Sequence, residues 1–446
     1  MLSGLKIPAI RSWGMSRSAA ETVATPQAGT SRSVLTGAVI LACALALIVF
    51  RDPSLFYEPR FWAEEATVYF HTAYVSPLST ALFAPHQGYY SLWANLAGIF
   101  ATIPLLEYAP AVTTAFAALV QLAVIVAILV NESSALDSPF KKAVAALASV
   151  VIGTPETWLI SVNTMYIFPL LVFLILIDSK ENAAKRRCWY AVAAVAGLTG
   201  PASNFLTPLF LLRYWQKRER ADLVLFAILA CTSLIVALSI VYSMTFLPDA
   251  VTGKRFNLHV HPARFFAEVI FFGMAYPLFG GFTTPMSALM KGAAGASAAL
   301  LALSVFLARS ALRELIYFPL AVVLLTVFSV FGSLNMEGGA RYAYASSVIV
   351  AILLLAQSTD AKLPLAARTL SGLLLFASLV FWCATFRSSY RDFHDPSWPS
   401  WSSEVRAWRA DPTRQLQVWP LWEAQKEQGV YWRMELPRAD SARSGS

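Results

Sequence analysis

Two adjacent carboxylates stand in the stretch PRFWAEEA at residues 59–66, just after an apolar run over residues 34–50. A carboxylate near a membrane surface can accept the proton of an incoming hydroxyl, or bind a divalent cation through its oxygens. A solvated acidic turn, or an ion pair with a nearby arginine, would need no such chemistry. The aromatic residues around the pair favour a loop that folds against the membrane, where burial raises the pKa of acids. We therefore expect Glu64 and Glu65 to be catalytic, and to hold the metal if one is bound.

A second stretch whose residues could bind a ligand is GGARYAY at residues 338–344, at the outer end of an apolar run. The glycines give the backbone freedom, and the guanidinium of Arg341 can donate paired hydrogen bonds to a phosphate. Snorkelling to the membrane surface, or an ion pair with Glu337, would explain the arginine equally well. The phosphate reading makes Arg341 a binding residue and Tyr342 a candidate substrate contact.

The third stretch is TGKRFNLHVHP at residues 252–262, which is basic on a side of the membrane where few positive charges are expected. Lys254 and Arg255 are therefore candidates for binding a lipid phosphate. His259 and His261 have the spacing of two metal ligands in an extended strand, but no third ligand lies near them in the sequence. We expect His259 to contact substrate instead.

The remaining candidate substrate contacts are Arg60 and Trp62 in the acidic loop, and Asn163 and Asn204 near two turns expected to face outward. The sequence contains no Walker loop, no nucleophile elbow and no H-E-x-x-H motif. Nucleotide-driven transport and serine hydrolysis therefore have no support from motifs.

The composition indicates which elements must position these residues. Of the 446 residues, 57% are hydrophobic and only 13% are charged, against about 25% in soluble domains. The mean hydropathy is +0.58, and several apolar runs approach the roughly 20 residues that span a bilayer. We predict an all-α polytopic membrane protein. Its net charge of +8 comes mostly from basic residues in short loops, which the positive-inside rule explains without nucleic acid.

The basic clusters also constrain the topology, because they should all face the cytoplasm. This constraint splits residues 142–180 and residues 187–213 into pairs of short spans. It leaves residues 89–108 as a juxtamembrane helix on the outer surface, anchored by Tyr89, Tyr90 and Trp93. The prediction is about eleven transmembrane helices, with the N-terminus inside and the C-terminus outside.

Three regions follow from this topology. Residues 1–33 are polar and are expected to form a disordered cytoplasmic tail. Residues 34–386 form the transmembrane domain, whose first outer loop covers residues 51–88. Residues 387–446 contain six of the thirteen tryptophans, so we expect a small folded extracytoplasmic cap.

The acidic pair after the first span resembles that of the GT-C-class multispan glycosyltransferases, which use polyprenyl-phosphate-linked sugars as donors. PRFWAEEA is similar to the acidic loop motif of bacterial members, and GGARYAY is similar to their late Arg-Tyr motif. GLTGPASNFLTPLFLLRYWQKR and VWPLW…YWRMEL resemble other recurrent segments, so the likeness covers most of residues 34–436 through short motifs. Many members have an Asp in the pair where this chain has Glu-Glu. That departure leaves open which carboxylate acts and whether a metal is held.

The resemblance implies an inverting sugar transferase of the bacterial inner membrane with a periplasmic active site. Glu64 or Glu65 would accept the proton of an acceptor hydroxyl as it attacks the anomeric carbon. The lipid phosphate would then leave, with its charge stabilised by Arg341 and by Lys254 or Arg255. The acceptor would be a glycan, a lipid or a protein, and the only cofactor left open is a divalent cation.

Two other classes of function remain open. A transporter or flippase of lipid-linked sugars would need ionisable residues near the middle of its spans, where this sequence has almost none. A non-catalytic protein of envelope assembly would need no acidic site at all.

Overall fold

The apolar runs fold into helices of two lengths. The computed structural model describes residues 28–179, 182–247, 262–280, 288–311, 315–333, 339–386, 400–421 and 431–437. Six helices in these ranges are long and apolar enough to cross a bilayer, in agreement with a helical membrane protein. They are α1 (Ala28–Arg51), α6 (Ala109–Val130), α11 (Arg220–Phe246), α15 (Ala288–Leu307), α18 (Tyr344–Thr359) with the turn before it, and α19 (Leu365–Ala384).

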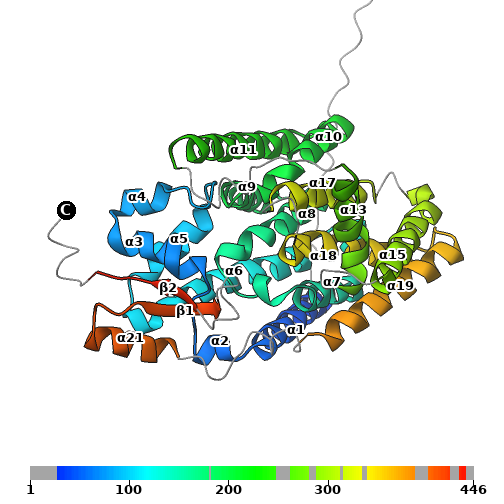
Figure 1. The fold of residues 1–446 in the computed structure, drawn as a ribbon. Helices are drawn as coiled ribbons and strands as arrows, with labels where there is room; N and C mark the ends of the chain where they lie inside the picture. The colour runs from blue at the N-terminus through cyan, green and yellow to red at the C-terminus, as the bar shows by residue number, and fades with distance from the viewer. Residues whose placement is uncertain are drawn as a thin grey trace, which may run out of the picture.

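Shorter helices pack against the long ones (Figure 1). They are α7 (Pro139–Val151), α8 (Phe168–Ile177), α9 (Ala183–Leu198), α10 (Thr207–Lys217), α13 (Pro262–Ile270), α14 (Tyr276–Phe279) and α17 (Tyr317–Phe331). The ten residues of α8 extend only about 15 Å, half of the hydrocarbon core. The number of about eleven spans counts several of these short helices and stays a prediction.

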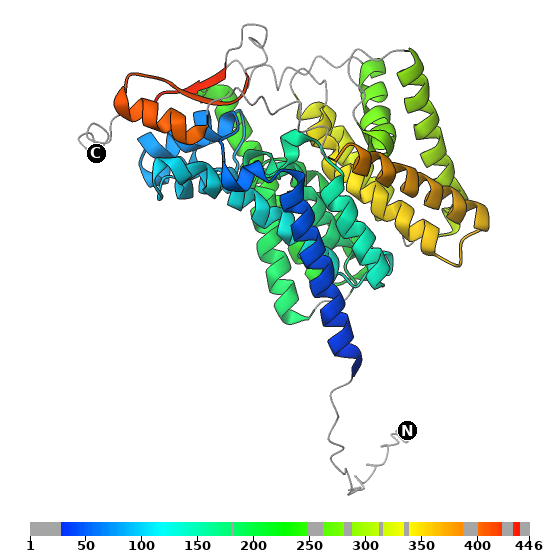
Figure 2. The ribbon, with the colours of Figure 1, turned by 90° about the horizontal axis from the view of Figure 1, so that it is seen from below.

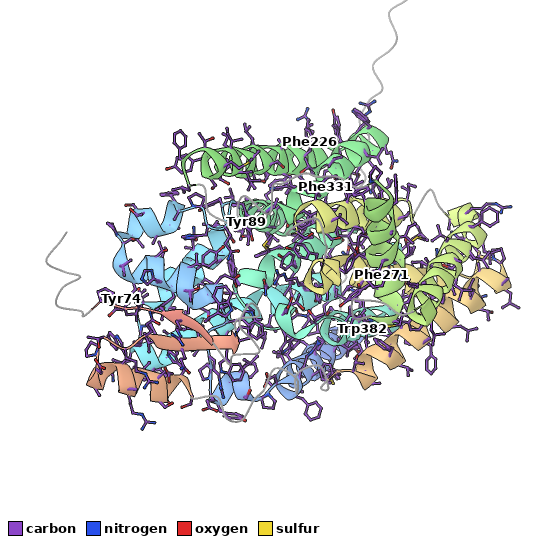
Figure 3. The ribbon with its side chains drawn as sticks, in the orientation of Figure 1. Tyr74, Tyr89, Phe226, Phe271, Phe331 and Trp382 are labelled. Carbon is purple, nitrogen blue, oxygen red and sulfur yellow. The ribbon has the colours of Figure 1, made fainter. Side chains whose placement is uncertain are left out.

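Burial distinguishes outer helices from central ones. In the most apolar part of each helix, 17% of α1 and 22% of α11 are buried, against 89% of the segment that contains α18. The short helix α8 is apolar all round and buried along nearly all its length, as expected for a helix enclosed by others. Figure 3 shows Tyr89, Phe271 and Trp382 among the helices of the bundle, and all three are buried. The exposed apolar side chains of α1 and α11 form the kind of surface that lipid covers.

One end of the bundle collects basic residues. This basic end is defined by Lys141, Lys142, Lys185, Arg213 and Lys217, which lie where α6, α8 and α10 end and where α7 and α9 begin. The side chains of Lys142, Lys185 and Arg213 donate to carbonyls at the ends of α6 and α8, which have no partner within the helix.

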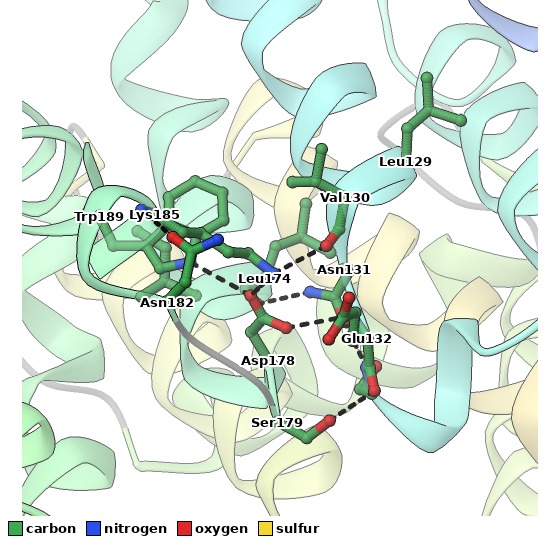
Figure 4. Close-up of polar contacts among 12 residues, drawn as sticks. Leu129, Val130, Asn131, Glu132, Leu174, Asp178, Ser179, Asn182, Lys185 and Trp189 are labelled. Carbon is green, nitrogen blue, oxygen red and sulfur yellow. Dashed lines mark hydrogen bonds and ion pairs between the residues drawn. The ribbon is translucent and has the colours of Figure 1, made fainter. Parts of the chain in front are cut away.

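Figure 4 shows the contacts that join α6, α8 and α9 at the basic end. Lys185 donates to the carbonyl of Val130 at 2.8 Å and forms an ion pair of 2.6 Å with the buried carboxylate of Asp178. Asp178 also accepts from the indole N–H of Trp189 at 3.2 Å and from the amide of Glu132 at 3.0 Å. A buried carboxylate is stable only with such partners.

A second buried ion pair lies nearby. Arg213 of α10 and Asp222 of α11 approach to 3.2 Å with side chains that are 3% and 1% exposed. The same guanidinium donates to the carbonyls of Ile175, Leu176 and Asp178 at the end of α8. This one side chain therefore ties three helices together.

The opposite end of the bundle carries a small cap. The cap consists of α21 (Trp401–Ala410) and the antiparallel strands β1 (Leu416–Leu421) and β2 (Tyr431–Met434). Figure 2 shows these elements at the end of the molecule toward which α1 runs, and we refer to it as the cap end. Trp401, Trp408, Val418 and Met434 form the apolar core of the cap. The all-α prediction did not include these two strands. They form here because alternate residues of β1 are apolar and face this core.

The loop after α1 and the segment that follows it form short helices at the cap end. They are α2 (Ser54–Tyr57), α3 (His71–Val75), α4 (Leu78–Phe83) and α5 (Leu92–Ala101). The prediction that Tyr89 and Tyr90 anchor a surface helix was wrong, since their side chains are only 3% and 8% exposed. The hydroxyl of Tyr89 lies 3.1 Å from the sulfur of Met165. This tyrosine therefore contacts the protein interior rather than the membrane surface.

Replacement of Arg213 tests the basic end. Arg213→Ala leaves the carboxylate of Asp222 buried without its cation, and we expect a loss of about 3–5 kcal/mol of unfolding free energy. Thermal or denaturant unfolding of the detergent-solubilised protein measures it. Lys217→Ala, one turn further along α10 and exposed, is the control and should change stability by less than about 0.5 kcal/mol. Equal effects of the two variants would contradict a role for the buried pair.

Candidate active site

The two adjacent glutamates of the acidic loop have different environments. Glu64 is partly exposed at the start of a π-helical segment, Glu65–Phe70. Glu65, one residue later, points inward and is only 3% exposed. The structure therefore separates one carboxylate that solutes can reach from one that is enclosed.

The carboxylate of Glu65 is held by three hydrogen bonds. Its Oε1 accepts from the amide of Ser161 at 2.5 Å and from the hydroxyl of Ser161 at 2.6 Å. Its Oε2 accepts from the amide of Trp62 at 3.1 Å. Burial raises the pKa of Glu65 to about 7, while these donors oppose the rise. Glu65 therefore connects the acidic loop to the turn that contains Ser161.

Each of the two segments that Glu65 connects contains a non-glycine residue with a left-handed backbone conformation. Ala63, next to Glu64, has a φ of 36°, and Leu159, two residues before Ser161, has a φ of 49°. Such a conformation costs roughly 1–3 kcal/mol and persists only where surrounding contacts impose it. Strained backbone on both sides of one carboxylate favours a functional constraint at this place.

Arg341 reaches the same region from the far end of the sequence. It lies in a 3₁₀ turn, Ala340–Ala343, that leads into α18. Its guanidinium is 3.5 Å from the carboxylate of Glu156, and both side chains are about one-third exposed, at 33% and 32%. Glu64 is also within electrostatic range of this guanidinium. The acidic loop, the turn with Glu156 and the late arginine therefore meet at the cap end.

Arg51 fixes the turn that carries Glu156. It is the last residue of α1, is only 2% exposed, and donates to the carbonyls of Val150 at 2.6 Å and Gly153 at 2.7 Å. Its guanidinium lies 4.4 Å from the ring centroid of Trp158 and 5.0 Å from that of Phe386. A buried arginine that caps the end of α7 keeps the following turn in one conformation.

Sequence reasoning did not assign roles to Arg51, Glu156 or Ser161. An arginine directly after an apolar run was the available signal for Arg51, since a charge at that place must find partners. Glu156 lies in a turn that was expected to face outward. No signal in the sequence points to Ser161, because its role depends on a contact with a residue 96 positions away.

Two buried donors near this group have no hydrogen-bond partner among the described residues. They are the indole N–H of Trp158 and the hydroxyl of Tyr276. Tyr276 is within electrostatic range of Glu156 and Arg51. Because buried donors are normally paired, these two are candidates for hydrogen bonds to a ligand.

Three further residues expected at the site make contacts within the protein. The amide of Asn163 donates to the carbonyl of Glu156 at 2.5 Å, and this residue is buried rather than outward-facing. The amide of Asn204 donates to the carbonyl of Gly197 at 2.9 Å and therefore braces the end of α9. Tyr342 is buried against Tyr166, with ring centroids 4.6 Å apart.

Arg60 and Trp62 contact the cap. Arg60 forms an ion pair of 3.1 Å with Glu58, and its guanidinium lies 3.9 Å from the ring centroid of Trp419. Trp62 forms a bridge to the backbone of Trp419 in β1. Lys254, Arg255 and His259 lie outside the described residues.

The two glutamates differ in how open their carboxylate oxygens are. Both oxygens of Glu65 already accept from N–H or O–H donors, which leaves Glu64 as the only open carboxylate of the pair. Among the residues that the structure describes, no three His, Cys, Asp or Glu side chains are grouped so that they could hold a metal ion.

No protein-family model matches this chain, and no curated protein is significantly similar to it in sequence.

Replacement of Glu65 by glutamine tests its ionisation. Between the ordinary pKa of 4.5 and the folded pKa of about 7, the folded protein binds more protons than the unfolded chain. Stability should therefore fall as the pH rises through this window, by at most about 3 kcal/mol. Glu65→Gln should remove this part of the pH dependence, as measured by unfolding at pH values from 4.5 to 8.

Glu64→Gln is the matched control for this experiment. It changes the adjacent, partly exposed carboxylate and should keep the dependence seen in the unaltered protein. If Glu65→Gln and the unaltered protein lose stability with the same slope, Glu65 does not titrate in this window.

Proposed function

We propose that this protein is a membrane glycosyltransferase, which moves a sugar from a polyprenyl-phosphate donor to an acceptor hydroxyl at the cap end. The observation that supports this most is the ion pair of Arg341 with Glu156 at 3.5 Å, in the turn to which Glu65 attaches the acidic loop. Glu64 on that loop is within electrostatic range of Arg341. An accessible carboxylate beside a cation at one end of a lipid-facing bundle matches the needs of this reaction. The two groups supply a base for the acceptor and a partner for the departing phosphate.

Glu64 is the base in this mechanism. It takes the proton of the acceptor hydroxyl while the acceptor oxygen forms a bond to the anomeric carbon. The bond from that carbon to the phosphate oxygen breaks, and its electron pair leaves with the phosphate. A single displacement of this kind inverts the anomeric carbon. Glu65 is enclosed by its donors, so its role is to fix the turn on which Glu64 stands.

Arg341 binds the phosphate. At 3.5 Å, its contact with Glu156 is longer than the 2.7–2.9 Å typical of a charge-assisted hydrogen bond, so a phosphate can compete for the guanidinium. Glu156 keeps the arginine in place before the donor binds. The unpartnered hydroxyl of Tyr276 is a further donor for this anion.

The bilayer places the lipid donor beside this site. We propose that the basic end faces the cytoplasm and the cap end the periplasm, by the positive-inside rule. The short helices α7, α8, α9, α10 and α17 then complete about eleven spans, because the long outer helices cover their backbone from lipid. The polyprenyl tail would lie against the apolar outer helices, and its phosphate at the cap end.

A transfer assay tests the reaction. The purified protein is incubated with a panel of radiolabelled undecaprenyl-phosphate hexoses and pentoses and with glycan, lipid and peptide acceptors. Glu64→Gln should lower kcat by at least about 100-fold, because general-base catalysis contributes 10²–10⁴-fold. Arg341→Ala should abolish transfer, while Arg341→Lys keeps the charge but loses the paired hydrogen bonds.

Glu132→Gln is the control for charge loss, since Glu132 is exposed at the basic end. It should leave transfer unchanged. Full activity of folded Glu64→Gln would contradict the assignment of the base. Absence of transfer by the unaltered protein from every donor in the panel would contradict the proposed reaction.

Cysteine labelling tests the orientation. The four native cysteines are exposed, so they are first replaced by alanine. Tyr57→Cys, at an exposed position of the acidic loop, should react with an impermeant maleimide in intact cells. Lys217→Cys at the basic end should react only after permeabilisation. The reverse pattern would place the proposed site in the cytoplasm.

A further inference from the structure

The segment that presents Glu64 is attached to the cap at successive residues. The guanidinium of Arg60 stacks on the ring of Trp419 at 3.9 Å. Phe61 packs edge-on against Trp401, with ring centroids 5.1 Å apart. Trp62 pairs with the backbone of Trp419, and the amide of Ala63 donates to the carbonyl of Trp419.

The last of these contacts acts on a strained residue. Ala63 has a φ of 36°, in the left-handed region that alanine adopts only at a cost. Its N–H is held by Trp419, and the carbonyl of Trp62 before it accepts from the amide of Glu65 at 2.8 Å. If the bond to Trp419 were lost, Ala63 would gain free energy by returning to negative φ. The chain direction at Glu64, the next residue, would then change.

The cap has separate contacts that hold it on the bundle. The indole N–H of Trp401 donates to the carbonyl of Leu106 at 2.8 Å. Arg409 forms a paired contact with the carboxylate of Glu107, of which one hydrogen bond measures 2.9 Å. Attachment of the cap therefore does not require Trp419, which contacts the segment of residues 60–63 instead.

We infer that Trp419 is a positioning residue for Glu64: the cap holds Ala63 in its left-handed conformation and thereby fixes the position of Glu64, the next residue. The cap is then a working part of the site, contributed by the C-terminal segment of the chain. Its consequence for catalysis rests on the proposed function, whereas its effect on the turn does not.

Hydrogen–deuterium exchange of the full-length protein in detergent tests the effect on the turn. Trp419→Ala keeps the main-chain carbonyl that accepts from Ala63 but removes the ring on which Arg60 stacks, so β1 should hold residues 60–63 less firmly. Exchange should therefore become roughly tenfold or more faster in peptides that cover residues 58–66, and also around Ser161, whose amide donates to Glu65. Arg60→Ala should act in the same direction without a change in the core of the cap. Peptides over residues 401–410 should keep their protection in both variants.

Ala63→Gly distinguishes positioning from general loosening. Glycine adopts positive φ without cost, so Ala63→Gly combined with Trp419→Ala should restore most of the lost protection. Arg409→Ala, which removes another contact of the cap, should leave residues 58–66 protected. Unchanged exchange there in Trp419→Ala and Arg60→Ala, an equal loss in Arg409→Ala, or no restoration by glycine would each overturn the inference.

The transfer assay adds the catalytic readout. Trp419→Ala should lower kcat by about tenfold or more while the KM for the donor stays within about twofold, because a displaced base affects the chemical step and leaves the phosphate contact intact. Ala63→Gly should recover part of this loss. If exchange responds as expected but the unaltered protein transfers no sugar, the proposed reaction fails while the positioning of the turn stands.

Discussion

The arrangement of the cap end depends on the burial of one carboxylate. Removing an ionisable group from water is costly unless hydrogen bonds replace the lost hydration. Glu65 obtains its replacements from Ser161 and from its own turn, so the acidic loop must lie against the turn after α7. The same turn carries Glu156, and Glu156 meets Arg341. Satisfying Glu65 therefore brings together three segments that are distant in the sequence.

Charge is distributed unequally between the two ends of the bundle. At the basic end, buried ion pairs such as Lys185 with Asp178 and Arg213 with Asp222 close the helix ends. Each of these charges has a tight partner and little exposure, which suits a structural role. At the cap end, Arg341 and Glu156 are looser and about one-third exposed. That combination of charge, access and incomplete pairing favours ligand binding there.

Neighbouring glutamates at the start of one helical segment have different environments because of local geometry. Consecutive side chains in a helical turn project in directions roughly 100° apart, so two adjacent residues can have different surroundings. Glu65 points inward, and Glu64 remains at the surface. The left-handed backbone at Ala63 sets where this segment begins, and Trp419 of the cap holds it there.

Several features could be predicted from the sequence alone. The helical membrane class, the breaks within residues 142–180 and 187–213, and the Trp-rich cap follow from hydropathy, basic loops and composition, which are local properties. The glutamate pair and the arginine of the candidate site could also be identified from the sequence. The burial of Tyr89, the bracing role of Asn163 and the strands of the cap could not, because they depend on which side chains face one another. Only the tertiary structure decided which glutamate is enclosed, since that depends on Ser161, a residue far along the chain that supplies the hydrogen bonds.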